Sequence, residues 1–164
     1  MRRKGWVAVA IGAVAGLAAT QGSRAGGHSG DDDRPRRVCS VATLRGAYGI
    51  QIQGTRPAPS PAPPGTIESV IGVIIRHYDG EGQFTQVNNE KGSISGNGPV
   101  DRESSGTYDV NEDCTGSHEL RIPGVPNPVT DRFVIVDRGR EVRHFVVNPA
   151  PVMVTGVSQK IDPR

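Results

Sequence analysis

The sequence predicts an all-β protein, built as a single eight-stranded antiparallel up-and-down β-barrel. Three observations lead to this prediction. Short runs rich in Val, Ile, Thr and Tyr alternate with clusters of Gly, Pro, Asn and Asp, as strands and turns do. The runs show no helical period. Most connections between them are short enough to be hairpins.

The strands are predicted from these runs in chain order. The clearest is 69–78 (SVIGVIIRHY), which is followed by the turn Asp79-Gly80-Glu81-Gly82. Turn residues also separate later runs, at 111–113, 138–139 and 148–151. No strand is predicted in the polar stretch that extends to about Gly98. The eight predicted strands are 43–54, 69–78, 83–88, 102–110, 115–122, 131–137, 141–147 and 152–160.

A proline-rich segment interrupts the pattern after the first strand. Residues 56–65 have the sequence RPAPSPAPPG. Because proline has no N–H to donate to a ladder, we expect this segment to be an extended, polyproline-like loop. In an up-and-down barrel it lies at the mouth, opposite the end where the first strand begins.

Closure of the sheet and the two cysteines, Cys39 and Cys114, support one another. An open meander of eight strands leaves two unpaired edges, which a barrel removes. Cys39 precedes the first strand and Cys114 lies between the fourth and fifth, so both fall at the same end of the barrel. We expect them to form a disulfide that stabilises the fold by up to about 4 kcal/mol in the chain-entropy model. Two free thiols and an intermolecular bridge are the alternatives.

The N-terminus has the pattern of an export signal. Arg2, Arg3 and Lys4 precede an uncharged apolar run, and Ser23-Arg24-Ala25 offers small residues for cleavage after Ala25. A retained membrane anchor and twin-arginine export are the alternatives. We predict a signal peptide at 1–25, a flexible charged tail at 26–38 and the barrel domain at 39–164, in a protein that is secreted or periplasmic.

Removal of the signal changes the sign of the net charge. The whole chain has 19 basic and 17 acidic residues. The predicted signal contains four basic residues and no acidic one, so 15 basic and 17 acidic residues remain, a net charge of −2. A weakly acidic protein offers no electrostatic basis for nucleic-acid binding. We expect neither nucleic-acid binding nor stable membrane insertion.

Three segments together resemble a family of small exported bacterial proteins of unknown function. Its members share the patterns C-x(4)-L-x-G-x-Y, D-G-x-G-x-F and G-T-Y-x-V-x-x-D-C-T-G, which are met here at 39–48, 79–84 and 106–116. The similarity covers most of residues 39–160. The barrel of this family resembles the eight-stranded type of allene oxide cyclases and dirigent proteins. Those proteins are dimers or trimers that hold small apolar molecules. The resemblance implies no catalytic residue, and the proline-rich segment 57–64 departs from it.

Several strands are apolar on both faces, which suggests both a ligand site and a contact surface. In the strand 69–78 we predict that Ile71, Val73, Ile75 and His77 face the lumen and contact a small apolar ligand, while the opposite parity remains possible. Tyr108 is a further candidate for ligand contact, although its Gly-x-Tyr setting is also typical of structural packing. The second apolar face needs a cover, which self-association into a homo-oligomer would provide.

Motifs for chemistry are weak. His77, His118 and His144 lie on predicted strands but lack ligand spacing, so we interpret them as ordinary surface or strand-end histidines. The run from Asp109 to Asp113 begins like a calcium loop, but the glycine and glutamate that the loop requires are absent. No metal, cofactor or catalytic residue is predicted.

Three function hypotheses follow. The first is non-catalytic binding of a small apolar ligand, or a protein interaction. The second is a cyclase or isomerase acting in the lumen, for which Glu68, His77, Tyr108 and His144 are the groups to inspect. The third is a structural role in an envelope-associated assembly, with a lumen filled by side chains.

Overall fold

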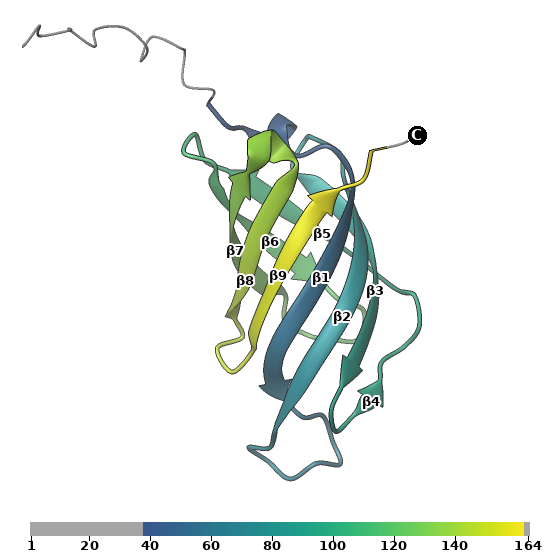
Figure 1. Ribbon diagram of the computed structural model, residues 1–164. Helices are drawn as coiled ribbons and strands as arrows, with labels where there is room; N and C mark the ends of the chain where they lie inside the picture. Colours follow the sequence, from purple (N-terminus) through teal and green to yellow (C-terminus); the bar gives the residue numbers. More distant parts are fainter. Residues whose placement is uncertain (1–37, 163–164) are drawn as a thin grey trace, which may run out of the picture. The chain divides into compact units, whose positions relative to one another are not determined.

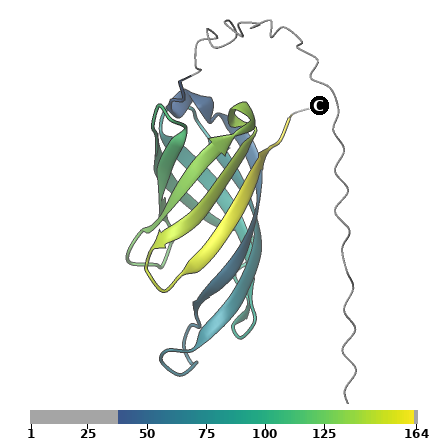
Figure 2. The ribbon, with the colours of Figure 1, turned by 60° about the vertical axis from the view of Figure 1, so that its left-hand side comes forward.

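The computed structural model describes residues 38–162, which form a closed eight-stranded antiparallel β-barrel with one short extra strand (Figures 1 and 2). The predicted fold class is therefore confirmed. The predicted signal peptide and all of the predicted tail except Val38 lie outside the described residues. The elements are η1 (Val41–Thr43), β1 (Gly46–Pro57), β2 (Ile67–Tyr78), β3 (Gln83–Gly92), β4 (Gly96–Asn97), β5 (Arg102–Val110), β6 (Thr115–Arg121), β7 (Val129–Val136), η2 (Asp137–Gly139), β8 (Glu141–Asn148) and β9 (Met153–Lys160).

Strand pairing closes the sheet in chain order. Each of the eight long strands pairs with its neighbour in antiparallel fashion, and the ladder between β1 and β9 joins the two ends of the sheet. The two-residue strand β4 pairs with the end of β3 and was not predicted, because its Gly-Asn sequence has no apolar pattern. Among residues 38–162, η1 and η2 are three-residue turns, and no helix there is long and apolar enough to span a bilayer.

The proline-rich loop differs from its prediction. β1 extends through Arg56 to Pro57, which is the last residue of the ladder and pairs with Ile67. The remaining loop is closed by a bond from the Ala58 N–H to the Thr66 carbonyl, at 2.8 Å. Two internal turns, with N–H donors at Ala62 and Thr66, fold it back on itself. The loop is therefore compact and not extended, because its non-proline residues still supply N–H donors for turns.

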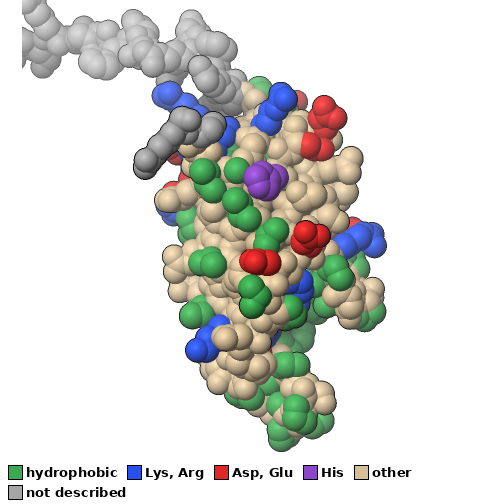
Figure 3. Space-filling model, turned by 90° about the vertical axis from the view of Figure 1, so that its right-hand side faces the viewer, with side chains coloured by type: hydrophobic (Ala, Val, Ile, Leu, Met, Phe, Trp, Pro, Cys, Tyr) green, Lys and Arg blue, Asp and Glu red, His purple; other side chains and the backbone are tan. Residues whose placement is uncertain are grey.

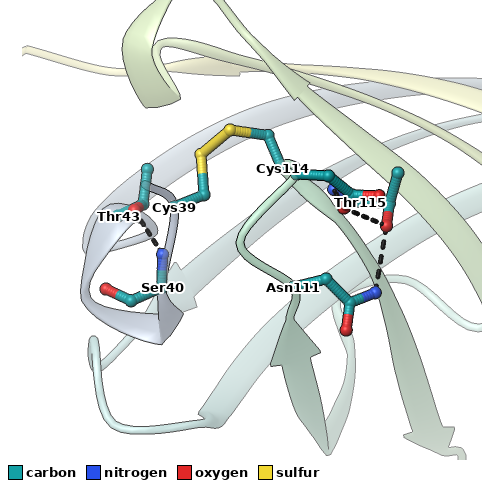
Figure 4. Close-up of a disulfide and its surroundings, with 7 residues drawn as sticks. Cys39, Ser40, Thr43, Asn111, Cys114 and Thr115 are labelled. Carbon is teal, nitrogen blue, oxygen red and sulfur yellow. Dashed lines mark hydrogen bonds between the residues drawn. A yellow bond between two sulfur atoms is a disulfide. The ribbon is translucent and has the colours of Figure 1, made fainter. Parts of the chain in front are cut away.

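The predicted disulfide is present and lies at one end of the barrel, which we call the disulfide end (Figure 4). Cys39 and Cys114 have Cα atoms 5.0 Å apart. The Cys39 N–H also donates to the Glu112 carbonyl, at 3.3 Å. Because Cys114 lies across the barrel from the start of β1, the segment from Cys39 to β1 passes over the end of the barrel. η1 in this segment is held by a bond from the Ser40 N–H to Thr43 Oγ1, at 3.0 Å.

Two buried tyrosines bind backbone carbonyls at the disulfide end, where the segment between Cys39 and β1 forms a cover over the barrel. The Tyr48 hydroxyl donates to the Gly139 carbonyl in η2, at 2.5 Å. The Tyr108 hydroxyl lies 3.0 Å from the carbonyls of both Val41 and Leu44. Gly139 has a φ of 86° and lies so close to the Thr43 carbonyl that a side chain would not fit. The two Gly-x-Tyr motifs are therefore structural, and their hydroxyls bind buried backbone instead of water.

The interior of the barrel is occupied by side chains. An aromatic core at the disulfide end includes Tyr48, Tyr78, Phe84, Tyr108 and Phe133, and a smaller cluster of Ile50, Ile52 and Ile74 lies farther along the barrel. Rings also cover inward-facing glycines of the neighbouring strands, where an added Cβ would overlap the ring: Phe84 at Gly106, Phe133 at Gly116 and His144 at Gly156. These contacts fill space that a ligand would otherwise occupy.

Candidate functional site

The prediction that Ile71, Val73, Ile75 and His77 face the lumen is wrong. Ile71 and Val73 are each 61% exposed, and Ile75 and His77 are also exposed on the outer surface. The inward residues of β2 are those of the opposite parity: Glu68, Val70, Gly72, Ile74, Arg76 and Tyr78. The reason is that the buried partners of Arg76 and Glu68 satisfy their charges, so the interior accepts them. Tyr108 does face inward, where it contacts the cover at the disulfide end.

Arg76 is the centre of a buried polar layer that the sequence did not predict. The residue is 2% exposed. Its Nε donates to Gln86 Oε1 at 2.7 Å, and its Nη1 donates to the Tyr78 hydroxyl at 3.1 Å. The guanidinium also lies 4.3 Å from the centre of the Phe84 ring, within the range of a cation–π contact. The cation is thus held by neutral partners.

His118 connects this arginine to a buried carboxylate. The Tyr78 hydroxyl lies 2.8 Å from His118 Nε2, and His118 Nδ1 lies 2.6 Å from Asp131 Oδ1. Because a carboxylate only accepts, we assign the imidazole proton to Nδ1, and the tyrosine then donates to Nε2. The layer therefore contains one cation, Arg76, and one anion, Asp131, joined through a tyrosine and a histidine.

His144 completes the layer from β8. Its Nδ1 lies 3.3 Å from Asp131 Oδ2. Its Nε2 is buried and has no hydrogen-bond partner among the described residues, and the same is true of Ser158 Oγ on β9. His118 and His144 are thus interior residues, which corrects their interpretation as surface histidines. His77 alone of the three lies outside. In the described part of the chain, no group of three or more His, Cys, Asp or Glu side chains is arranged to hold a metal ion.

The surroundings shift the pKa values of the two central groups. Burial, reinforced by the nearby Arg76 charge, lowers the pKa of His118 from 6.5 to about 4 and outweighs the opposing contact with Asp131. Burial by itself would raise the pKa of Asp131. Its bonds from His118 and His144 reverse this effect, so the pKa lies below its usual value. His118 is therefore neutral and Asp131 ionised at neutral pH.

Acid is expected to destabilise the protein through His118. Between pH 6.5 and 4 the unfolded chain takes up a proton on His118 that the folded chain does not. The contribution of neutral His118 to the free energy of unfolding is therefore fully present above pH 6.5. It is lost as the pH falls to 4, and the loss is roughly 3 kcal/mol. Urea denaturation across this range measures the loss. In a His118→Gln variant the pH slope should shrink. A flat wild-type profile would show that water reaches His118.

A second ionic cluster lies at the end of the barrel opposite the disulfide, which we call the loop end. Arg56 donates to Glu68 at 2.9 Å and to Glu90 at 2.8 Å, and Arg102 donates to Glu90 at 3.2 Å. The pKa of Glu68 is lowered to about 2, chiefly by the hydrogen bond from the Ser95 N–H and also by the bond from Arg56. Glu68 therefore fixes the turn after β3 at this rim and stays ionised, which does not suit it to proton transfer.

The outer surface carries the features that suit binding. A hollow of about 710 Å³ lies over β1, β9, β8 and β7, and we call it the β8–β9 groove. Its outward side chains include Phe145, Val157 and Val134, with Gln51 and Gln53 at the β1 edge and Arg132 at the β7 edge. Arg143 of β8 lies between Val157 and Val134. Phe145 is 52% exposed. An aromatic side chain so exposed is available to a partner.

The outward faces of β2, β1 and β9 lack Asp, Glu, Lys and Arg, and we call these three neighbouring faces the uncharged wall. Each of the other five long strands has a charged outward side chain: Lys91, Glu103, Asp109, Glu119, Arg121, Arg132, Glu141 and Arg143. The wall's outward residues are Ile67, Ser69, Ile71, Val73, Ile75 and His77 of β2, Ala47, Gly49, Gln51, Gln53, Thr55 and Pro57 of β1, and Met153, Thr155, Val157 and Gln159 of β9. Figure 3 shows this side of the molecule: hydrophobic side chains and one histidine lie on a surface that is mostly uncharged, with acidic side chains near the middle of the view and Lys or Arg nearer its edges. The wall was missed because charge was counted over the whole chain and not by strand face.

Comparison with known proteins adds no relative to this geometry. The chain matches no protein family model, and neither a curated protein nor a solved structure is significantly similar to it. The resemblance to small exported bacterial proteins therefore stays a prediction.

Proposed function

We propose that the protein is an exported, non-catalytic binding protein that engages an apolar partner with the outside of its barrel. The observation that carries the proposal is the uncharged wall, with the β8–β9 groove at its edge. Three adjacent strands without a charged outward residue, bearing Ile71, Val73 and Met153 at exposed positions, are costly to leave in water. Large exposed apolar surfaces of soluble proteins mark interaction sites.

The occupied interior supports an outer site over a lumen site. Rings cover the inward glycines, and the polar layer of Arg76, His118 and Asp131 crosses the middle of the barrel. An apolar ligand placed there would have to separate these paired groups, at a cost of about 3–5 kcal/mol for a broken buried pair. Binding outside the barrel has no such cost.

Export is supported by two independent features. The first is the basic, apolar and small-residue order of residues 1–25. The second is the Cys39–Cys114 disulfide, since such bonds persist in oxidising compartments. Intact mass of protein from an exporting host tests this part: the expected product begins after Ala25 and contains no free thiol.

The fluorescent dye bis-ANS, which has apolar rings and sulfonate groups, is a suitable probe for the binding surface. At nanomolar protein concentration we expect the dye to bind the wild type and to bind Phe145→Glu at least about tenfold more weakly. The reason is that the new carboxylate removes apolar area from the groove and repels the sulfonates.

Val125→Glu is the matched control, because it adds the same charge to an exposed residue in the β6–β7 loop. This variant should bind the dye as the wild type does. Absent binding, or equal affinity of Phe145→Glu and wild type, would contradict an apolar binding site in the groove.

A second candidate function, an isomerase or cyclase acting inside the barrel, rests on His144. Its Nδ1 contacts Asp131, and its buried Nε2 is without a partner among the described residues, as in a general base oriented by a carboxylate. His144 is covered by Gly156 of β9. The candidate therefore requires the interior to open, and His144 would then react with a histidine-modifying reagent in the folded protein.

A further inference from the structure

We propose that the partner of the uncharged wall is a second copy of this chain, arranged about a twofold axis that runs along β1. This inference rests on the proposed function, because it names the occupant of the same surface. Three properties of the wall support a second copy as the partner: its charge, its register and its size.

The charge of the wall suits self-association. In a twofold interface each surface meets its own copy, so a cluster of like charges would meet itself and repel. The outward faces of β2, β1 and β9 contain no Asp, Glu, Lys or Arg. The two central polar residues, Gln51 and Gln53, have amides that both donate and accept. A glutamine that faces its own copy across the axis therefore finds a hydrogen-bonding partner.

The register of the wall places a ridge and a groove at the same height. Gln51 pairs with Val73 on β2 and with Val157 on β9. Val73 belongs to the exposed aliphatic ridge of β2, whereas Val157 lines the β8–β9 groove. Rotation by half a turn about an axis along β1 lays the β2 of one copy over the β9 of the other. Val73 then faces the second copy's Val157, and the reverse contact forms symmetrically.

The size of the wall meets the requirement of a stable dimer. β1 and β2 have 12 residues each, and β9 has eight. At about 3.3 Å per residue and about 4.8 Å between strands, these three strands span roughly 500 Å² of plane. Two copies then bury about 1,000 Å², which is the area that a specific interface must reach. Two sheets also pack well face to face through β-branched side chains.

The pairing of Val73 with Val157 gives the proposal a sharp test by sedimentation equilibrium of the full chain. We expect the wild type to be a dimer. Val73→Lys and Val157→Glu should each weaken dimerisation at least about a hundredfold, because each homodimer would have to bury two added charges of the same sign. An equimolar mixture of the two variants should form a heterodimer, in which one Lys–Glu pair and one Val–Val pair replace the two valine contacts.

Val125→Lys is the matched control, since it changes an exposed valine of the β6–β7 loop to lysine and should leave the dimer intact. Far-ultraviolet circular dichroism confirms that each variant is folded, and recovery of the heterodimer shows that loss in the single variants is not misfolding. A wild type that is monomeric at every concentration, or a mixture that stays monomeric, would overturn the proposal. If bis-ANS still binds the groove of that monomer, only the second copy is excluded. If the dye does not bind, the proposed function fails as well.

Discussion

Replacing Asp131 by Asn is expected to destabilise the protein by about 3–5 kcal/mol, because it leaves the buried Arg76 cation without a compensating anion. Asp131 also accepts from His118 Nδ1 at 2.6 Å and lies 3.3 Å from His144 Nδ1. An asparagine offers one carbonyl oxygen in place of two carboxylate oxygens, so one of the two histidine contacts is lost. Urea denaturation followed by tyrosine fluorescence measures the change.

Asp109→Asn is the control for this experiment. Asp109 lies on the outward face of β5 and is exposed, so its replacement should change stability by less than about 0.5 kcal/mol. The double variant Arg76→Met/Asp131→Asn should be more stable than the sum of the single losses predicts, because it removes both buried charges. Additive losses, or a small effect of Asp131→Asn, would show that the two charges are not coupled through Tyr78 and His118.

Removal of the disulfide is the second large effect that we expect. Replacing Cys39 and Cys114 by Ser should lower the free energy of unfolding by about 2–4 kcal/mol, because a 75-residue span between the cysteines is no longer closed in the unfolded chain. The cover over the disulfide end then depends on the Tyr108 bonds to Val41 and Leu44. Thermal unfolding with and without reductant measures the loss in the wild type.

The Ser variant serves as the control for the reductant, since its unfolding temperature should not respond to it. An unfolding temperature of the wild type that reductant leaves unchanged would contradict a stabilising role for this bond.

The strand order and the disulfide could be predicted from sequence because they depend on local signals. Turn residues such as Gly80, Gly82 and Gly139 separate the apolar runs, and each has a positive φ in the structure. The position of Cys114 relative to Cys39 then follows from counting hairpins. The end of β1 was placed too early because Arg56 and Pro57 were assigned to the loop.

The orientation of β2 could not be predicted because both of its faces are apolar. Val70 and Ile74 face inward, whereas Ile71, Val73 and Ile75 face outward. Arg76 and Glu68 share this inward face. Their burial also depends on Gln86 and Ser95, which lie outside β2, so no pattern within this strand predicts it.

The buried polar layer was missed for the same reason. His118, Asp131 and His144 lie on three different strands and meet only because β6, β7 and β8 are neighbours in the barrel. In the structure His118 pairs with Asp131, and Phe133 pairs with His144, so all three polar residues lie on one face. That face becomes the interior only once the parity of the barrel is known.

Modification of histidines by diethylpyrocarbonate, read by mass spectrometry, tests the central claim most directly. The claim is that side chains fill the interior of the barrel, so that only its outer surface is accessible to a partner. His77 is exposed, whereas His118 is 1% and His144 9% exposed. We predict that the folded protein is modified at His77 while His118 and His144 remain protected until urea unfolds the chain. Modification of His144 or His118 in the folded protein, at a rate close to that of His77, would show an accessible lumen and contradict binding by the outer wall alone.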